Sequence, residues 1–198
     1  ADVEFFATDD YNNNVTANAG FTVNKSTSNI TIDVNSIYKV GDDIVITLTP
    51  VNSTGSVSVT VNGKSYTVND NKVTIADGLS AGEYIINAVL DGDENYTGSN
   101  AIKSFKVIKR DIAVTLADVD GIKVDSPVTF TANLNETVTG DVIFTINGAN
   151  YTVSISDANK ATFTYTPTTN ATLTVVATFA GNDKYNANSS AAKVFDVE

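Results

Sequence analysis

The sequence of 198 residues contains no cysteine, no histidine and no tryptophan. Without cysteine the chain cannot form a disulfide framework, a thiol nucleophile or a cysteine-ligated zinc site. Without histidine it lacks the usual general base and the commonest protein ligand for metals. These absences remove the parts that most enzyme mechanisms require, so we expect no catalytic activity.

Positive charge is also scarce, because 12 basic residues stand against 23 acidic residues and give a net charge of −11. Affinity for nucleic acid comes largely from lysine and arginine, so we expect no nucleic-acid partner, and an anionic membrane surface is disfavoured for the same reason. The sequence has no apolar run long enough to span a membrane, no signal peptide and no initiator Met. We therefore expect a piece of a longer protein.

The sequence does contain an internal repeat. VNGKSYTV at 61–68 returns as INGANYTV at 146–153. Three tyrosines in polar loops are each followed by a phenylalanine and, two residues further, a valine: Tyr11 with Phe21 and Val23, Tyr96 with Phe105 and Val107, and Tyr185 with Phe195 and Val197. This repetition predicts complete domains at 26–109 and 110–198, preceded at 1–25 by the C-terminal strand pair of another repeat.

Within each repeat, apolar and polar residues alternate with the period of a half-buried β-strand. Asn62-Gly63 and Asn147-Gly148, each between two such segments, predict tight hairpins of type I′. In LSAGEYIINAVL, Tyr84 has the spacing of a tyrosine corner, whereas the second repeat has Leu173 there. No segment has a helical period.

About seven short antiparallel strands in each repeat fit an immunoglobulin-like sandwich of two sheets. The fold class is therefore all-β, with tandem immunoglobulin-like β-sandwich domains. The expected strands are 30–34, 43–49, 55–61, 65–68, 72–75, 83–90 and 102–107, and then 112–118, 128–133, 141–146, 150–155, 160–166, 172–179 and 191–197. The expected core residues are Ile46, Val59, Tyr84, Ala88 and Phe105, and Phe130, Phe144, Val175, Ala177 and Phe195.

The Asn-Gly hairpin, the Leu-x-x-Gly-x-Tyr segment and loops such as GDENYT and GNDKYN resemble a known family. They are similar to the tandem bacterial-type Ig-like (Big) repeats of adhesin-like surface proteins of methanogenic archaea, over essentially the whole chain. The resemblance implies an extracellular stalk or adhesion module, on the cell surface or cell wall, with neighbouring Ig-like repeats in the parent chain. It supplies no catalytic residues.

The loop DGDENYTGSN at 91–100 offers oxygen ligands of the kind that calcium binds: Asp91, Asp93, Glu94 and Asn95. Their spacing fits no calcium-loop motif, and the corresponding loops around Tyr11 and Tyr185 share the tyrosine but not the carboxylates. We favour a polar hairpin tip in which Tyr96 packs against its own hairpin or the neighbouring domain. A calcium site is the alternative. No other metal or cofactor is expected.

N-glycosylation sequons are frequent, which suggests an extracellular glycoprotein, although the high content of Asn, Ser and Thr explains many of them. The candidate acceptors are Asn14, Asn52, Asn95, Asn135, Asn170 and Asn188.

Two rival functions remain at this stage. Paired carboxylates can hydrolyse glycosides without histidine or cysteine, but the pairs Asp42-Asp43 and Asp118/Asp120 lie in connections typical of solvated turns. A carbohydrate-binding accessory module of an extracellular, wall-associated enzyme would stack sugars on exposed aromatic rings, and tryptophan is absent. We favour a non-catalytic adhesin-like fragment whose ligand, protein or glycan, lies on a partner or host cell.

Overall fold

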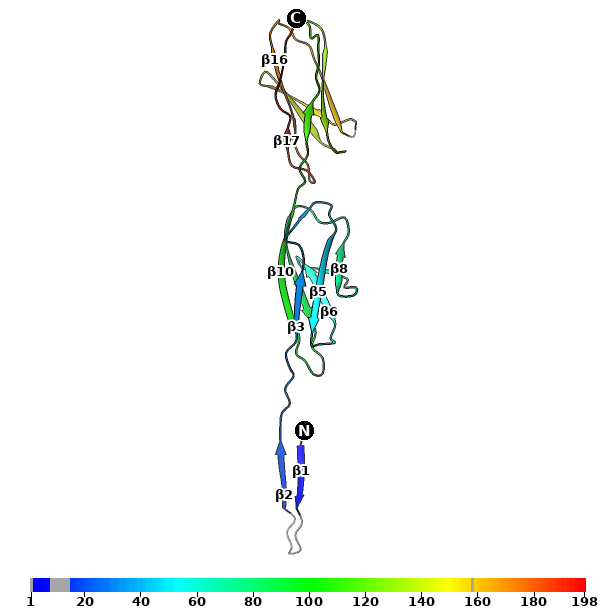
Figure 1. Ribbon diagram of the computed structural model, residues 1–198, viewed down its shortest axis with the longest axis vertical. Coiled ribbons are helices and arrows are strands. Elements are labelled where there is room, and N and C mark those ends of the chain that lie inside the picture. Colours follow the sequence, from blue (N-terminus) through cyan, green and yellow to red (C-terminus); the bar gives the residue numbers. More distant parts are fainter. Residues whose placement is uncertain (1, 8–14, 158) are drawn as a thin grey trace. The chain divides into compact units, whose positions relative to one another are not determined.

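The structure of the chain is a computed structural model that describes residues 2–7, 15–157 and 159–198 (Figure 1). Every element of secondary structure assigned within these ranges is a β-strand, which confirms the predicted all-β class. The same ranges contain no helix that is long and apolar enough to cross a membrane. The chain divides into two compact units, Ala1–Asp33 with Ile46–Val73 and Ile86–Lys103, and Val34–Val45 with Thr74–Ile85 and Ser104–Glu198. The repeat boundaries proposed from the sequence stay a prediction.

The N-terminal strands form a two-stranded antiparallel sheet of β1 (Asp2–Ala7) and β2 (Val15–Gly20). Their register runs from Asp2 opposite Gly20 to Ala7 opposite Val15. A strand pair was expected within 1–25, but β2 ends before Phe21 and Val23, whose side chains are 53% and 80% exposed.

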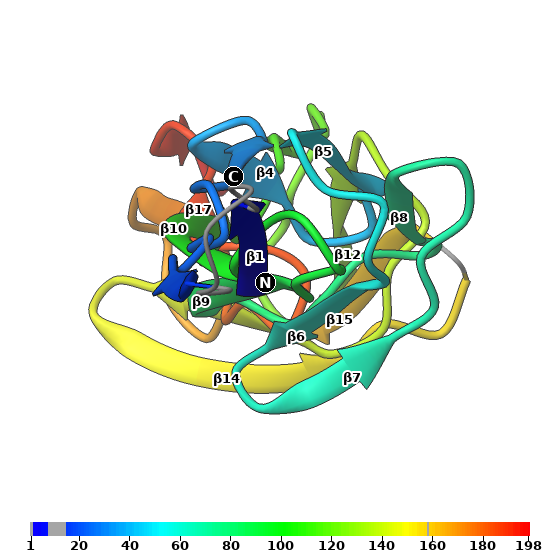
Figure 2. The ribbon, with the colours of Figure 1, turned by 90° about the horizontal axis from the view of Figure 1, so that it is seen from below.

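The first complete repeat contains two sheets, in the strand orders β4-β10-β9-β6-β7 and β3-β5-β8. The β6–β7 hairpin, coloured cyan to green, is visible in Figure 2. Val61 pairs with Lys64 across Asn62-Gly63, and both turn residues have positive φ, so the predicted hairpin is confirmed. The strands are β3 (Asn29–Asp33), β4 (Ile37–Lys39), β5 (Ile44–Val51), β6 (Val57–Val61), β7 (Lys64–Tyr66), β8 (Lys72–Ile75), β9 (Gly82–Leu90) and β10 (Ser99–Ile108).

The sequence did not predict β4, and the expectation of purely antiparallel strands is wrong there. β4 pairs in parallel with the end of β10, with Ile37 opposite Lys106 and Lys39 opposite Ile108. Three residues are too few to show a period of two, and Ile37 is an exposed apolar residue within them. The position of β4 depends on a pairing with residues about 70 positions later.

The second repeat also contains two sheets, in the orders β11-β12-β15 and β14-β13-β16-β17, and β18 pairs with β16. Ile146 pairs with Ala149 across Asn147-Gly148, again with positive φ at both turn residues. The strands are β11 (Val114–Leu116), β12 (Val128–Leu134), β13 (Asp141–Ile146), β14 (Ala149–Ser154), β15 (Lys160–Tyr165), β16 (Leu173–Phe179), β17 (Asn188–Ser189) and β18 (Lys193–Phe195).

The core residues follow the predicted alternation almost throughout. Nine of the ten expected core side chains are buried: Ile46, Val59, Ala88, Phe105, Phe130, Phe144, Val175, Ala177 and Phe195. Tyr84 is the exception, because it is only half-buried. In the second repeat the buried residues form one continuous hydrophobic cluster.

Candidate functional site

The loop after β9 is organised by Asp93. Its Oδ1 accepts hydrogen bonds from the backbone N–H groups of Asn95 and Tyr96, both at 2.9 Å. Its Oδ2 accepts from the N–H of Thr54 at 2.8 Å and from the Thr54 hydroxyl at 3.1 Å. The Thr54 N–H contributes most to lowering the pKa of Asp93, which the full set of donors holds at about 2.

These contacts also bear on the proposed calcium ligands. The Asp91 carboxylate accepts a hydrogen bond from the Ser56 hydroxyl, while Glu94 and Asn95 are exposed. Both Asp93 oxygens already have two donors. Among the residues that the structure describes, no three acidic side chains lie close enough together to hold a metal ion. The structure therefore uses Asp91 and Asp93 to fix neighbouring loops and does not gather the four candidates into one ligand set.

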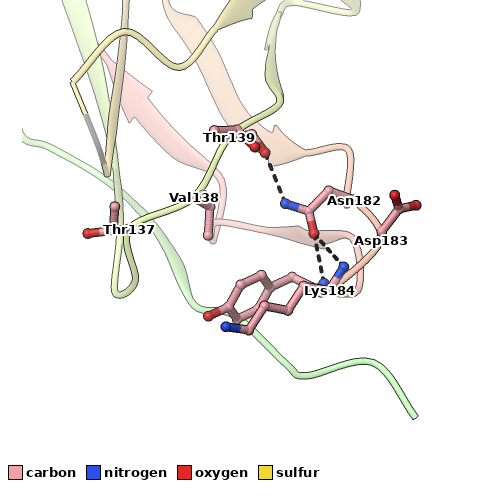
Figure 3. Close-up of a pocket in the computed structure, with 7 residues that line it drawn as sticks. Thr137, Val138, Thr139, Asn182, Asp183 and Lys184 are labelled. Carbon is pink, nitrogen blue, oxygen red and sulfur yellow. Dashed lines mark hydrogen bonds between the residues drawn. The ribbon is translucent and has the colours of Figure 1, made fainter. Parts of the chain in front are cut away.

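The second repeat builds the same turn with an amide. Asn182 Oδ1 accepts from the N–H groups of Lys184 and Tyr185 at 2.9 and 2.8 Å, and Asn182 Nδ2 donates to the carbonyl of Thr139 at 3.0 Å (Figure 3). A recess of about 360 Å³ lies between this turn and residues 137–139. Asp93 and Asn182 thus have the same role, in which a side-chain oxygen binds two successive backbone N–H groups.

Each of these turns also binds the segment of chain that leads into its repeat. In the first repeat, Ser26 donates its N–H to the carbonyl of Asn95 at 2.9 Å and accepts from the N–H of Thr97 at 2.8 Å, as a parallel bridge beside Tyr96. Lys25 Nζ donates to the backbone carbonyl of Asp93 at 2.6 Å. We call Lys25 and Ser26, with their partners in 93–97, the first entry clamp.

The second entry clamp repeats this arrangement. Arg110 donates its N–H to the carbonyl of Lys184 at 2.8 Å and accepts from the N–H of Asn186 at 2.9 Å. Lys109 Nζ donates to the carbonyl of Asn182 at 2.6 Å, as Lys25 does to Asp93. Sequence reasoning missed both clamps. The available signal was a lysine two residues after each of the first two Phe-x-Val segments, at Lys25 and Lys109.

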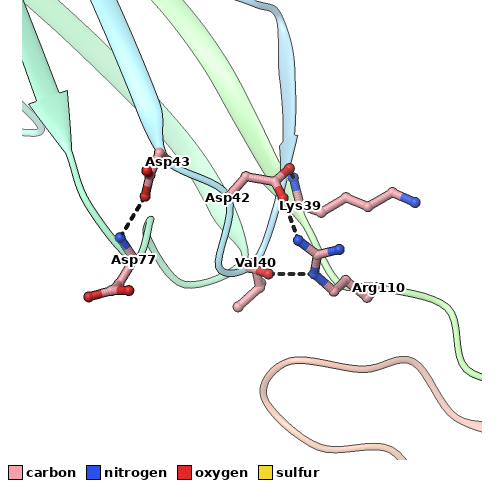
Figure 4. Close-up of polar contacts among 6 residues, drawn as sticks. All are labelled: Lys39, Val40, Asp42, Asp43, Asp77 and Arg110. Atoms are coloured by element: carbon pink, nitrogen blue, oxygen red, sulfur yellow. Dashed lines mark hydrogen bonds and ion pairs between the residues drawn. The ribbon is translucent and has the colours of Figure 1, made fainter. Parts of the chain in front are cut away.

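The Arg110 side chain has partners of its own in the turn after β4. Its Nε donates to the carbonyl of Val40 at 2.8 Å, and its guanidinium forms an ion pair with Asp42 (Figure 4). The other oxygen of Asp42 accepts from the N–H of Lys39 at 2.8 Å.

Three of the four carboxylates considered for glycoside hydrolysis have structural partners. Asp42 binds Arg110, whereas the neighbouring Asp43 accepts a hydrogen bond from the N–H of Asp77 at 3.0 Å. Asp118 forms an ion pair with Lys193. Asp42, Asp43 and Asp118 therefore serve in turns and ion pairs of the fold.

The start of the long strand carries Tyr84 in β9 and Leu173 in β16. Tyr84 donates its hydroxyl to the carbonyl of Ser80 at 2.9 Å, which confirms the predicted tyrosine corner, and its ring stacks on Phe105 with centroids 5.3 Å apart. In the second repeat Leu173 is buried at this place. There the side chain of Asn147 accepts from the N–H of Thr174 at 2.8 Å and donates to the carbonyl of Thr172 at 3.1 Å.

The glycosylation candidates fall into different settings. Asn14 lies outside the described residues. Three others are exposed in loops: Asn52, Asn95 and Asn170. The remaining two are exposed but have their side-chain amides in hydrogen bonds, because Asn135 Oδ1 accepts from the N–H of Ala113 and Asn188 Nδ2 donates to the carbonyl of Ile112.

Part of the chain, within the second repeat, is similar to a known protein family. Residues 115–198 match the bacterial Ig-like domain (group 3). No curated protein matches the sequence.

Several solved structures are similar to the chain. Fibronectin(III)-like modules of CbhA from Clostridium thermocellum have 14% identity, 85% coverage of this chain, 92% coverage of theirs and a TM-score of 0.36. A 1.5-MDa bacterial ice-binding adhesin has 20% identity, 88% and 66% coverage and a TM-score of 0.41. A protein from Corynebacterium diphtheriae described as membrane-anchored has 16% identity, 99% and 57% coverage and a TM-score of 0.39. The chain thus spans less than two thirds of the last two structures. The match of residues 115–198 to the bacterial Ig-like domain agrees with the sandwich fold described above.

Proposed function

We propose that the chain is a non-catalytic part of an adhesin-like protein of the cell surface, and that its Ig-like domains act mechanically as a stalk or adhesion module. The match of residues 115–198 to a bacterial Ig-like domain supports this proposal. So does the duplication of the entry clamp, because a repeat that fixes the chain entering it is suited to serial arrangement. The parent protein is extracellular, and its ligand is a protein or glycan on another cell.

The observation that carries the proposal is the parallel pairing of early and late segments in each repeat. In the first repeat β4 pairs with β10 through the bonds Lys106 N–H to Ser36 carbonyl and Val40 N–H to Ile108 carbonyl, both 2.9 Å. Tension applied at the two chain ends pulls parallel neighbours in opposite directions along one axis. The hydrogen bonds between them are then loaded together, whereas in an antiparallel hairpin they would open one by one.

The second repeat contains the same element. Ile122 and Val197 form a parallel bridge, and Glu198 exchanges backbone hydrogen bonds with Ile122 at 2.8 Å and Val124 at 3.0 Å. Both repeats are therefore built to resist pulling along the chain.

Single-molecule force spectroscopy with handles at both ends tests this function. We expect two separate unfolding events, each releasing about 25–30 nm at 3.3–3.6 Å per residue. Val40→Pro removes one N–H of the β4–β10 pairing and should lower the force of one event only. Thr162→Pro, on an exposed position of β15, is the control for loss of a strand N–H outside the parallel element. Unfolding of both repeats at forces as low as those of an antiparallel hairpin would refute the mechanical role.

A carbohydrate-binding module remains the second candidate because the second repeat has partly buried aromatic rings on β14 and β15. However, Tyr151 stacks on Phe163 with centroids 4.6 Å apart, and Phe163 stacks on Phe144 at 6.0 Å. The faces of these rings contact one another, which leaves less ring surface for sugar stacking. Titration with cell-wall glycans would favour the module if binding disappeared in Tyr151→Ala while the fold persisted.

A further inference from the structure

Arg110 forms polar contacts through both its backbone and its side chain. Its backbone N–H and carbonyl belong to the second entry clamp, where they bind Lys184 and Asn186. Its guanidinium binds the Val40 carbonyl and the Asp42 carboxylate in the turn after β4. All of these residues belong to the compact unit that comprises Val34–Val45, Thr74–Ile85 and Ser104–Glu198.

The turn that receives the guanidinium is itself fixed. Asp42 accepts from the N–H of Lys39 at 2.8 Å, so its second oxygen is oriented toward Arg110. The N–H of Val40 binds the carbonyl of Ile108 at 2.9 Å, which ties the turn to the end of β10. A guanidinium donates in a planar fork and can bind a carbonyl and a carboxylate at once, which an ammonium group does less well.

The first entry clamp shows which of these contacts are special to the second. Lys25 and Lys109 bind equivalent carbonyls, and Ser26 and Arg110 make equivalent bridges. Ser26 has no long side chain with which to bind a preceding turn. The backbone contacts are therefore common to both clamps, and the guanidinium contacts are an addition at Arg110.

We propose that Arg110 locks the connection between the two complete repeats by holding the turn 39–42 with its side chain and the loop 184–186 with its backbone. The connection is then stiff because both of its flanks are bound by one residue. This inference goes beyond the proposed function, since it holds whatever ligand the protein binds. The side chains of Arg110 and Asp42 are 34% and 38% exposed. Salt therefore reaches the pair and weakens it in part.

The absence of cysteine makes a direct measurement simple, because introduced cysteines are the sole sites for thiol-directed spin labels. Ser104→Cys on β10 and Thr162→Cys on β15 are exposed positions on either side of the connection. Pulsed electron resonance then gives the distribution of distances between the two labels in the full chain. With Arg110 present we expect one narrow distribution.

Three variants and one control separate the contributions. Arg110→Ser reproduces the residue of the first clamp, keeps the backbone bridge and should broaden the distribution about twofold or more, as expected for a flexible connection. Asp42→Asn can still accept from Lys39 and should broaden it less, because the Val40 bond remains. Arg110→Lys keeps the charge but loses the fork and should resemble Asp42→Asn. Lys193→Gln breaks the Asp118 ion pair of the same unit and should leave the distribution unchanged.

Hydrogen exchange of the Arg110 and Asn186 amides reports whether the backbone bridge survives in each variant. Broadening in Arg110→Ser with these amides still protected supports the lock. An unchanged distribution in Arg110→Ser refutes it. Loss of amide protection together with broadening would also refute it as stated, because the side chain would then act by supporting the bridge.

Discussion

Asn147 provides a sharp test of how a hairpin residue supports the fold. Its backbone has φ 47° in a two-residue turn, a conformation that Asn and Gly tolerate. Its side chain also accepts from the N–H of Thr174 at 2.8 Å and donates to the carbonyl of Thr172 at 3.1 Å. The Asn147 side chain thus fixes the start of β16, in the repeat that lacks the tyrosine corner.

Two substitutions divide these roles. Asn147→Gly keeps the positive φ and removes both side-chain hydrogen bonds, so it should destabilise the chain by about 1–2 kcal/mol at roughly 0.5–1 kcal/mol for each exposed bond. Asn147→Asp keeps the acceptor for Thr174 but places a carboxylate oxygen against the Thr172 carbonyl. Near pH 7 the loss of stability in Asn147→Asp should exceed the contribution of a single hydrogen bond, and it should become smaller when the carboxylate is protonated.

Urea unfolding followed by circular dichroism measures these losses, and hydrogen exchange at the Thr174 amide assigns them to the side-chain contact. Gly148→Ala is the matched control for turn strain, since Gly148 has φ 88° and an added Cβ would meet no atom within 4 Å. If Asn147→Gly is as stable as the parent chain, the side-chain contacts contribute nothing and Asn147 serves only the turn.

Three further outcomes are expected. Phe105→Ala should cost about 3–5 kcal/mol in urea unfolding, because Phe105 is 3% exposed and contacts the rings of Tyr38 and Tyr84; a loss near zero would place it outside the core. The lowered pKa of Asp93 means that its contribution to stability is complete above about pH 4 and is lost as the pH falls through about 2. Thermal melting between pH 4 and pH 2 should therefore be less pH-dependent in Asp93→Asn, and equal slopes would contradict this. The melting temperature should be the same in millimolar calcium as in a chelator, since the oxygens of Asp93 already accept from four donors. A calcium-dependent rise in melting temperature that Asp93→Asn abolishes would show that the loop binds the ion.

The sequence predicted those parts of the fold that depend on local patterns. Alternation identified the strands with continuous buried faces, such as β5 and β16, and Asn-Gly located both tight hairpins. Prediction from the sequence failed for β4, whose parallel pairing with β10 depends on residues far away in the sequence. It also failed to foresee that Tyr84 is half-buried, because the hydroxyl bond to Ser80 keeps the ring near the surface.

The polar contacts were less predictable than the core. An acidic run around Asp93 suggests a metal site as readily as a turn, since both need carboxylate oxygens. Only the structure shows that Thr54, which lies 39 residues earlier, supplies two of the donors. Likewise, the lysine that recurs after Phe-x-Val does not by itself reveal that Lys25 binds the carbonyl of Asp93, 68 residues later. Hydrogen bonds to backbone atoms leave no signature in the identity of the partner residue.

The comparison of Asp93 with Asn182 indicates what the tyrosine loops need. One residue carries a charge and the other does not, yet each presents an oxygen to two successive N–H groups and its backbone carbonyl to a lysine from the entering chain. A calcium site would require the charge, and a clamp requires only the oxygen and the turn. The clamp geometry is retained in the second repeat, where the charge is lost. A role in the clamp therefore explains both loops, whereas a role of the carboxylate charge would explain only the loop of Asp93.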